Sequence, residues 1–202
     1  KVIKLKVGIR VFDGLKDYER DVEVIRESKR MCQKHGPNVR LVADANQGFV
    51  DAPTTVSVLR RVEGCLDWLE QPILADDKLG FKRIKDSSET KLMADESVHN
   101  AHDARLLLEL RAVDYINVKL MKTGGMIEAL KIAELAEGYG IPCQVGSMLE
   151  NKLGAAMLLH TFFCHKNLRT IEAGFFGEIV DPIGEGISIS ERKVNLTSTT
   201  RG

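Results

Sequence analysis

The sequence has no excess of charge, no long apolar run and no recognisable cysteine motif. Its 29 Lys and Arg residues balance its 29 Asp and Glu residues, which gives no electrostatic argument for binding nucleic acid or an acidic membrane surface. No apolar run approaches the ~20 residues that a membrane span needs. The four cysteines match no zinc or redox spacing, so we expect reduced thiols in a cytoplasmic protein.

A dinucleotide-binding signature is also absent, because no G-x-G-x-x-G opens a helix. The sequence instead alternates short apolar runs with longer amphipathic ones. The apolar runs predict strands at residues 2–7, 39–43, 66–69, 91–94, 115–118, 142–145 and 169–171. Helices are predicted at residues 16–34, 54–62, 80–85, 101–110, 126–139 and 153–165. This alternation favours parallel strands, either in an open doubly wound sheet or in a (β/α)8 barrel.

The spacing of polar residues at the strand ends favours the barrel. Lys6, Asp44, Glu70, Asp95 and Lys119 each follow an apolar strand, and after a first gap of 38 residues the intervals are 26, 25 and 24. A regular period of this kind is typical of a barrel, whose chemistry collects at the carboxyl ends of the strands. Seven strands in 202 residues fit one catalytic barrel domain, residues 1–202, that lacks its first strand, and we expect a fragment of a longer protein.

Three acids stand at three consecutive strand ends, namely Asp44, Glu70 and Asp95. Each one alone is better explained as a helix cap or a solvated loop charge. Three acids in register are poorly explained in that way, because carboxylates gathered at one barrel mouth repel one another unless a cation lies between them. Hard oxygen ligands suit Mg²⁺, with Mn²⁺ as the alternative.

Three lysines accompany these acids. Lys4 and Lys6 alternate within the first strand and therefore share one face, while Lys119 interrupts an otherwise apolar strand end four units further on. An exposed edge strand would explain the first pair equally well. In a barrel, both would point toward the mouth, where a neutral lysine can remove the proton next to a substrate carboxylate while a metal stabilises the enediolate. A second lysine on the opposite face can return the proton.

Six ordered segments carry a resemblance to a known family. They are KLKVG (4–8), VADANQ (42–47), WLEQP (68–72), MADES (93–97), INVK through KTGG (116–125) and GSMLE (146–150). With them the chain resembles the enolase superfamily, in particular its muconate-lactonizing and mandelate racemase type, and within that the dipeptide epimerases. The resemblance implies a TIM-type α/β barrel in which Asp44, Glu70 and Asp95 bind Mg²⁺. It implies the following roles for the lysines: Lys6 as one acid/base, Lys4 as its electrostatic partner and Lys119 as the acid/base on the opposite face.

The resemblance also implies residues around the metal and the substrate. Asn46 would support the metal site, and Ser147 and Met148 would lie close to the substrate. Members that bind a dipeptide's ammonium group carry Asp-x-Asp on the last strand, where this sequence reads Glu172-Ala173-Gly174. One acid of that pair is retained as Glu172 and the other is missing, so the identity of the substrate stays open.

Two further expectations concern the activity and assembly of the protein. Its members have an N-terminal capping domain that closes the site, and none of it is present in this sequence. We therefore expect little or no turnover from residues 1–202 alone. For the full-length form we expect a homo-oligomer.

The leading hypothesis is a metal-dependent racemase or epimerase that acts on a small-molecule carboxylate with two opposed lysines. One alternative keeps the same site and changes the outcome to a syn-dehydration or a cycloisomerisation of the muconate-lactonizing or o-succinylbenzoate synthase type. Another alternative is a non-enzymatic barrel, either a scaffold or an inactive remnant. We expect no nucleic-acid partner and no membrane partner.

Overall fold

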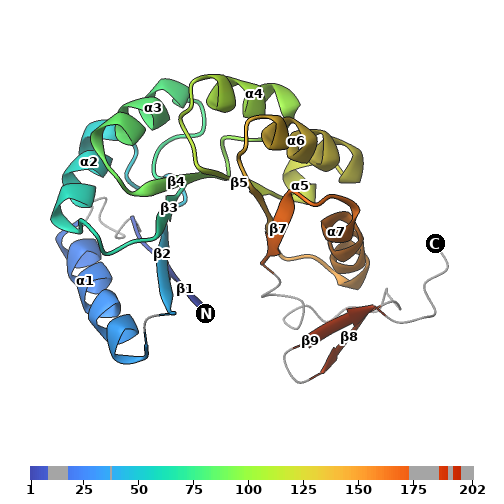
Figure 1. Ribbon diagram of the computed structural model, residues 1–202, viewed down its shortest axis with the longest axis horizontal. Helices are drawn as coiled ribbons and strands as arrows, with labels where there is room; N and C mark the ends of the chain where they lie inside the picture. Colours follow the sequence, from blue (N-terminus) through green and yellow to red (C-terminus); the bar gives the residue numbers. More distant parts are fainter. Residues whose placement is uncertain (9–17, 37, 173–186, 191–192, 197–202) are drawn as a thin grey trace. The chain divides into compact units, whose positions relative to one another are not determined.

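Strands and helices alternate along the chain in the computed structural model, which describes residues 1–8, 18–36, 38–172, 187–190 and 193–196 (Figure 1). The strands are β1 (Val2–Lys6), β2 (Arg40–Asp44), β3 (Trp68–Glu70), β4 (Lys91–Ala94), β5 (Tyr115–Val118), β6 (Cys143–Val145), β7 (Leu168–Ile171), β8 (Ile187–Ser190) and β9 (Lys193–Leu196). The helices are α1 (Tyr18–Lys34), α2 (Ala52–Arg61), α3 (Lys78–Ser87), α4 (Ala101–Glu109), α5 (Leu120–Thr123), α6 (Met126–Gly138) and α7 (Lys152–Cys164). The α/β class expected from the sequence is confirmed.

The first of two compact units comprises Lys1–Ile116. Its strands pair in parallel and in chain order from β1 to β5, and Figure 1 shows α1 to α4 on one side of them. The register places Lys6 opposite Asp44 and Asp44 opposite Glu70. Because partners in a parallel ladder point to the same face, these three side chains lie next to one another at the carboxyl ends of β1, β2 and β3.

Local sequence signals explain how the helices of this unit begin and which side they bury. Asp77 caps α3 by accepting a hydrogen bond from the backbone N–H of Gly80 at 2.7 Å, as Asp51 does for α2 through Thr54. Phe81 and Ile84 follow at helical spacing and are fully buried. The apolar stripe of the helix therefore covers the strands and holds their carboxyl ends in place.

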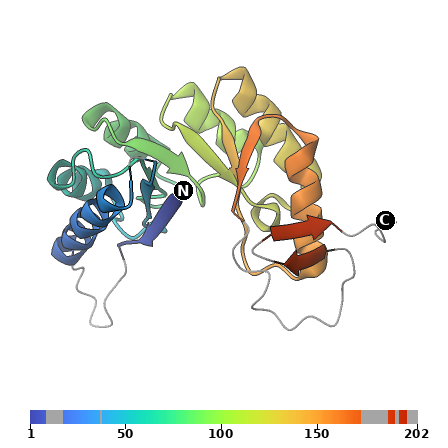
Figure 2. The same cartoon turned by 60° about the horizontal axis from the view of Figure 1, so that its bottom comes forward.

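The second unit comprises Asn117–Gly202. Strands β6 and β7 pair in parallel, while β8 and β9 form an antiparallel pair beside α7 (Figure 2). The sequence analysis missed α5, β8 and β9. A single helical turn such as α5 is too short to show a 3.6-residue period, and two four-residue strands give too little alternation to be recognised. Within the described ranges, no helix is both long and apolar enough to cross a membrane.

A close backbone contact joins the loops that follow β1 and β2. A Cβ atom on Gly48 would lie 2.2 Å from the carbonyl oxygen of Gly8 and 2.8 Å from that of Ala45. Gly8 itself has φ +68°, a backbone conformation that residues with a side chain rarely adopt. The two glycines thus allow the loops to approach closely beside Lys6 and Asp44.

We expect two glycine-to-alanine substitutions to change the free energy of unfolding in opposite directions. Gly48→Ala should lower the free energy of unfolding by about 1–3 kcal/mol, because the new methyl group collides with backbone atoms. Gly138→Ala, in α6 where a Cβ would meet nothing within 4 Å, should raise it by up to about 1 kcal/mol through helix propensity. Urea unfolding measures both, and a Gly48→Ala variant as stable as the parent would contradict the contact.

Candidate active site

The three acids singled out in the sequence lie together at the carboxyl ends of neighbouring strands. Asp44 is the last residue of β2, Glu70 is the last residue of β3, and Asp95 directly follows β4. Their exposed fractions are 1%, 1% and 0%. All three carboxyl groups are therefore removed from water at the same edge of one sheet, which is the edge where parallel α/β folds collect their chemistry.

Both lysines of β1 contact these acids. Lys4 Nζ lies 3.1 Å from Asp44 Oδ2 and 2.9 Å from Glu70 Oε2. Lys6 Nζ donates to Asp44 Oδ2 and to Asn46 Oδ1, each at 2.6 Å. The Lys6 side chain is 56% exposed, so one ammonium group faces solvent at the rim while the other lies deeper between two carboxylates.

The electrostatics of the site are dominated by crowded negative charge. Burial and repulsion from Asp44 and Asp95 together raise the pKa of the Glu70 carboxyl to about 7, against the opposing effect of Lys4. Burial and the charge of Asp95 likewise raise the pKa of Glu96 above its usual range. The two lysines therefore do not fully offset the charge of the acids.

A divalent cation fits this donor chemistry. Carboxylate oxygens are the ligands that Mg²⁺ prefers, and the raised pKa of Glu70 marks a cluster that an added positive charge would relieve. Among the residues that the structure describes, no three acidic, histidine or cysteine side chains are close enough together to hold a metal ion. Lys4 and Lys6 contact Asp44 and Glu70 instead, so an ion bound there would compete with these lysine contacts.

Three polar residues of this rim were not predicted from the sequence. Glu96 accepts a hydrogen bond from Asn46 Nδ2 at 2.9 Å, so it faces the same rim as Asp95. If β4 continued through residue 96, the alternation of side chains would place Glu96 on the face opposite to Asp95. The strand ends at Ala94, so that alternation does not apply to Glu96. Gln71 and Ser97 are buried, and they lie one and two residues after Glu70 and Asp95 in the sequence. The sequence signal that could have identified them is this position, a polar residue just after a strand-end acid.

The remaining predicted site residues belong to the second unit. Lys119 is half-buried and directly follows β5, at the N-terminus of α5. Ser147 is buried and Met148 is exposed, in a loop fixed by Glu150, whose carboxylate oxygens accept from the backbone N–H of Met148 at 2.7 and 2.8 Å. That Lys119 faces Lys6 across a substrate stays a prediction.

Glu172 lies at the end of β7 in the same unit. Its Oε2 accepts a hydrogen bond from Gln144 Nε2 at 3.2 Å, so its carboxylate is directed toward β6. Ala173 and Gly174, which complete the departure from Asp-x-Asp, lie outside the described residues.

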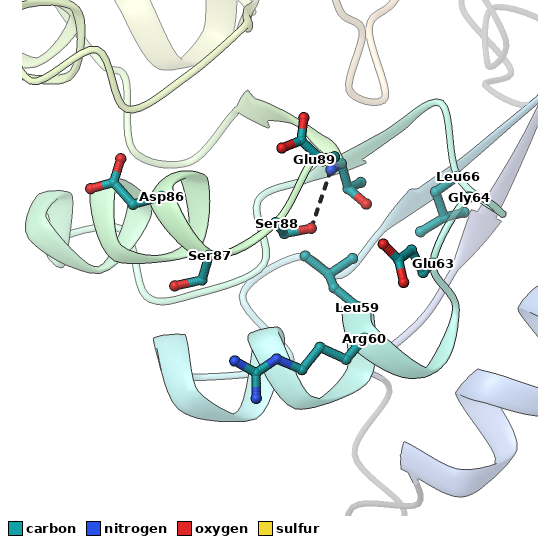
Figure 3. A pocket seen from close by; sticks show the side chains of 10 residues that line it. Leu59, Arg60, Glu63, Gly64, Leu66, Asp86, Ser87, Ser88 and Glu89 are labelled. Carbon is teal, nitrogen blue, oxygen red and sulfur yellow. Dashed lines mark hydrogen bonds between the residues drawn. The ribbon is translucent and has the colours of Figure 1, made fainter.

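Two hollows of the first unit lie at opposite ends of its strands. One of about 420 Å³ is formed by the segments that precede β3 and β4, and Arg60, Glu63, Asp86 and Glu89 are among the side chains around it (Figure 3). The other, of about 470 Å³, is lined in part by Lys6, Asn46 and Leu74. Of these two hollows, only the second is lined by predicted site residues, Lys6 and Asn46, so it is the one that concerns the chemistry.

Parallel β/α units with buried acids, and lysines beside them, at the carboxyl ends of their strands are typical of (β/α)-barrel enzymes. The Enolase C-terminal domain-like family matches residues 1–196. The chain belongs to this family, as its sequence segments had indicated.

Several relatives of this chain are named as racemases or epimerases, and muconate lactonizing enzyme from Pseudomonas putida is also among the similar structures. The N-succinyl-L-Arg/Lys racemase of Bacillus cereus is 35% identical over 170 residues, which cover 84% of this chain and 43% of that protein. A substrate-liganded L-Ala-D/L-Glu epimerase from Bacillus subtilis superposes with a TM-score of 0.83 at 34% identity, over 97% of this chain and 53% of that one. A dipeptide epimerase from Enterococcus faecalis, complexed with Mg and L-Leu-L-Tyr, has a TM-score of 0.74 at 32% identity, over 85% of this chain and 46% of that one. The chain thus spans about half the length of these relatives.

The raised pKa of Glu70 predicts how the stability of the metal-free chain depends on pH. Because the folded pKa of about 7 exceeds the ordinary 4.5, the folded state binds more protons than the unfolded state between these values. The free energy of unfolding should therefore fall as pH rises from about 5 to about 8, by something on the order of 3 kcal/mol. Urea unfolding in the presence of a chelator measures this slope.

Two variants assign the slope to this carboxyl group. Glu70→Gln should flatten it, because an amide does not titrate, whereas Glu63→Gln, at an exposed acid, should leave it unchanged. Stability that rises with pH over this range, or an equal slope in Glu70→Gln, would show that Glu70 is ionised throughout.

Proposed function

We propose that this protein is a racemase or epimerase that removes and returns the proton on the carbon next to a substrate carboxylate. The observation that carries the proposal is the contact of two lysines with buried acids at one strand edge: Lys4 with Asp44 and Glu70, and Lys6 with Asp44. Acids and lysines are the two sets of groups that enolate chemistry requires, one for a metal ion and one for the proton. The racemase and epimerase relatives support the same reaction.

We assign the metal site to Asp44, Glu70 and Asp95, with Mg²⁺ as the ion and Mn²⁺ as its substitute. When bound, the ion would neutralise the substrate carboxylate and stabilise the enediolate that forms as the proton leaves. The complex of a related dipeptide epimerase with Mg supports this assignment. Asn46 contributes indirectly, because its side chain links Lys6 to Glu96 at the edge of the acid cluster.

Lys6 is assigned as the base on one face of the substrate. Its ammonium group is at the rim and borders the hollow of about 470 Å³, while Asp44 and Asn46 fix its direction through two hydrogen bonds. Lys4 lies deeper and supplies positive charge beside the same carboxylates. Lys119 is assigned as the group that returns the proton on the other face.

The relatives point to one class of substrate. An N-succinyl amino acid and a dipeptide share an acylated amino group and a proton next to a carboxylate. We propose that the substrate belongs to this class of N-acylated amino acids, with Ser147 and Met148 beside it and the single acid Glu172 available to a cationic group. We further propose that the protein acts in the cytoplasm as a homo-oligomer.

Binding of Mg²⁺ is expected to require all three acids. Isothermal titration of the full-length gene product should detect binding in the parent and none in Asp44→Asn, Glu70→Gln or Asp95→Asn, since each removes a charged ligand. Asp114→Asn is a matched control, because that carboxylate pairs with Lys85 at the other end of the strands. Unchanged binding in any one of the three site variants would remove that residue from the metal site.

Proton exchange in D₂O tests the two-base reaction. With each enantiomer of an N-acylated amino acid supplied separately, Lys6→Ala should abolish α-proton exchange of one enantiomer and spare the other, and Lys119→Ala should do the reverse. Positioned acid/base groups contribute about 10²–10⁴ in rate, so nuclear magnetic resonance would resolve the difference.

Other outcomes of the exchange experiment would point to other functions. If both variants lost exchange of the same enantiomer, the two-base reaction would be wrong. If Lys119→Ala kept exchange but stopped turnover, a dehydratase or cycloisomerase would be the better description. An intact full-length protein that exchanged no carboxylate's α-proton would favour a scaffold.

A further inference from the structure

The side chain of Gln71 forms a buried clamp between the two strand ends that carry Glu70 and Asp95. Gln71 is 0% exposed and directly follows Glu70. Its Oε1 accepts hydrogen bonds from the backbone N–H groups of Asp95 at 2.9 Å and Ser97 at 3.1 Å. Its Nε2 donates to the carbonyl oxygen of Ile73 and to Ser97 Oγ, both at 2.8 Å.

These four bonds use the whole hydrogen-bonding capacity of an amide side chain, which has two donor hydrogens and two acceptor lone pairs. A fully satisfied buried amide is rigid, because every rotation about its terminal bonds would leave a buried polar group unpaired. Two of the four partners lie on Ser97 and one is the backbone of Asp95. The clamp therefore acts on the segment that presents the Asp95 carboxylate.

The backbone of Gln71 extends the same connection to the neighbouring strands. Its N–H donates to the carbonyl oxygen of Met93 at 2.9 Å, and its carbonyl oxygen accepts from the N–H of Gln47 at 2.8 Å. Gln71 has φ +37°, an unfavourable region for a residue with a side chain, so surrounding contacts must hold it there. One residue thus ties together the segments that follow β2, β3 and β4, and each of these strands presents one acid.

We propose that Gln71 is a positioning residue that sets the spacing of the Glu70 and Asp95 carboxylates for a metal ion, an inference that rests on the metal site assigned under the proposed function. The reason is electrostatic. Buried carboxylates repel one another, and a lysine in the same place would attract them and compete with the metal ion. A neutral amide bonded to backbone groups holds the strand ends together without changing the charge of the site.

Partners that orient metal ligands typically contribute about 10–100-fold in metal affinity. Gln71→Met keeps the length of the side chain and removes all four bonds, so it should weaken Mg²⁺ binding by about that factor. Ser97→Ala removes one of the four bonds and should weaken binding less, by roughly 10-fold, at the lower end of that range. Isothermal titration of the full-length gene product measures both affinities, and Ser97→Ala keeps the test valid if Gln71→Met does not fold.

A matched variant separates positioning from general stability. Asn167 is also a buried amide that donates to two backbone carbonyl oxygens, those of Ala133 at 3.1 Å and Ile141 at 2.9 Å. Asn167→Leu should lower the melting temperature about as much as Gln71→Met and leave Mg²⁺ affinity within about twofold. In metal-free protein, hydrogen exchange at the Asp95 and Ser97 amides should speed up in Gln71→Met and not in Asn167→Leu.

The outcomes distinguish this inference from the proposed function. Weaker Mg²⁺ binding in Gln71→Met, together with faster exchange at Asp95 and Ser97, supports the positioning role. Parent-like affinity in Gln71→Met, or an equal loss in Asn167→Leu, overturns the positioning role alone and leaves the metal site standing. A parent protein that binds no Mg²⁺ overturns the metal site and the positioning role together.

Discussion

The burial of three like-charged carboxylates at one sheet edge is the constraint on which the rest of this structure depends. Asp44, Glu70 and Asp95 are almost completely removed from water, and Glu70 shows the cost as a pKa raised to about 7. Such an arrangement persists only when the surrounding fold is rigid and supplies opposite charge. Here Lys4 and Lys6 supply the charge, and the hydrogen bonds of Gln71 supply the rigidity.

The parallel register explains why the acids lie at the same edge of the sheet. Each β/α unit delivers its strand in the same direction, so residues far apart in the sequence reach the same edge. Lys6, Asp44 and Glu70 are consecutive partners across three strands, although 64 positions separate the first from the last. Helix caps and the close approach of Gly8 to Gly48 then fix the loops around them, so the scaffold and the site share the same determinants.

The family resemblance and the geometry support the same kind of chemistry through different observations. The relatives include an N-succinyl-L-Arg/Lys racemase, an L-Ala-D/L-Glu epimerase and a dipeptide epimerase, which match 84%, 97% and 85% of this chain. The geometry independently places lysines against acids at the carboxyl ends of the strands. Within the proposed class of N-acylated amino acids, the resemblance implies a pair of acids on the last strand of dipeptide epimerases, and this chain carries one acid there, Glu172.

The sequence alone determined the α/β class, the order of seven strands and the segments that carry acids and lysines, because alternating apolar runs and strand-end polar residues are local patterns. Tertiary structure decided the rest. That Lys4 lies between Asp44 and Glu70, that Glu96 faces Asn46, and that Gln71 bonds to the backbone of Asp95 all depend on contacts between strands about 25 residues apart or more. Hydrogen-bond partners and desolvation arise only when separate strands pack together, and no local pattern records them.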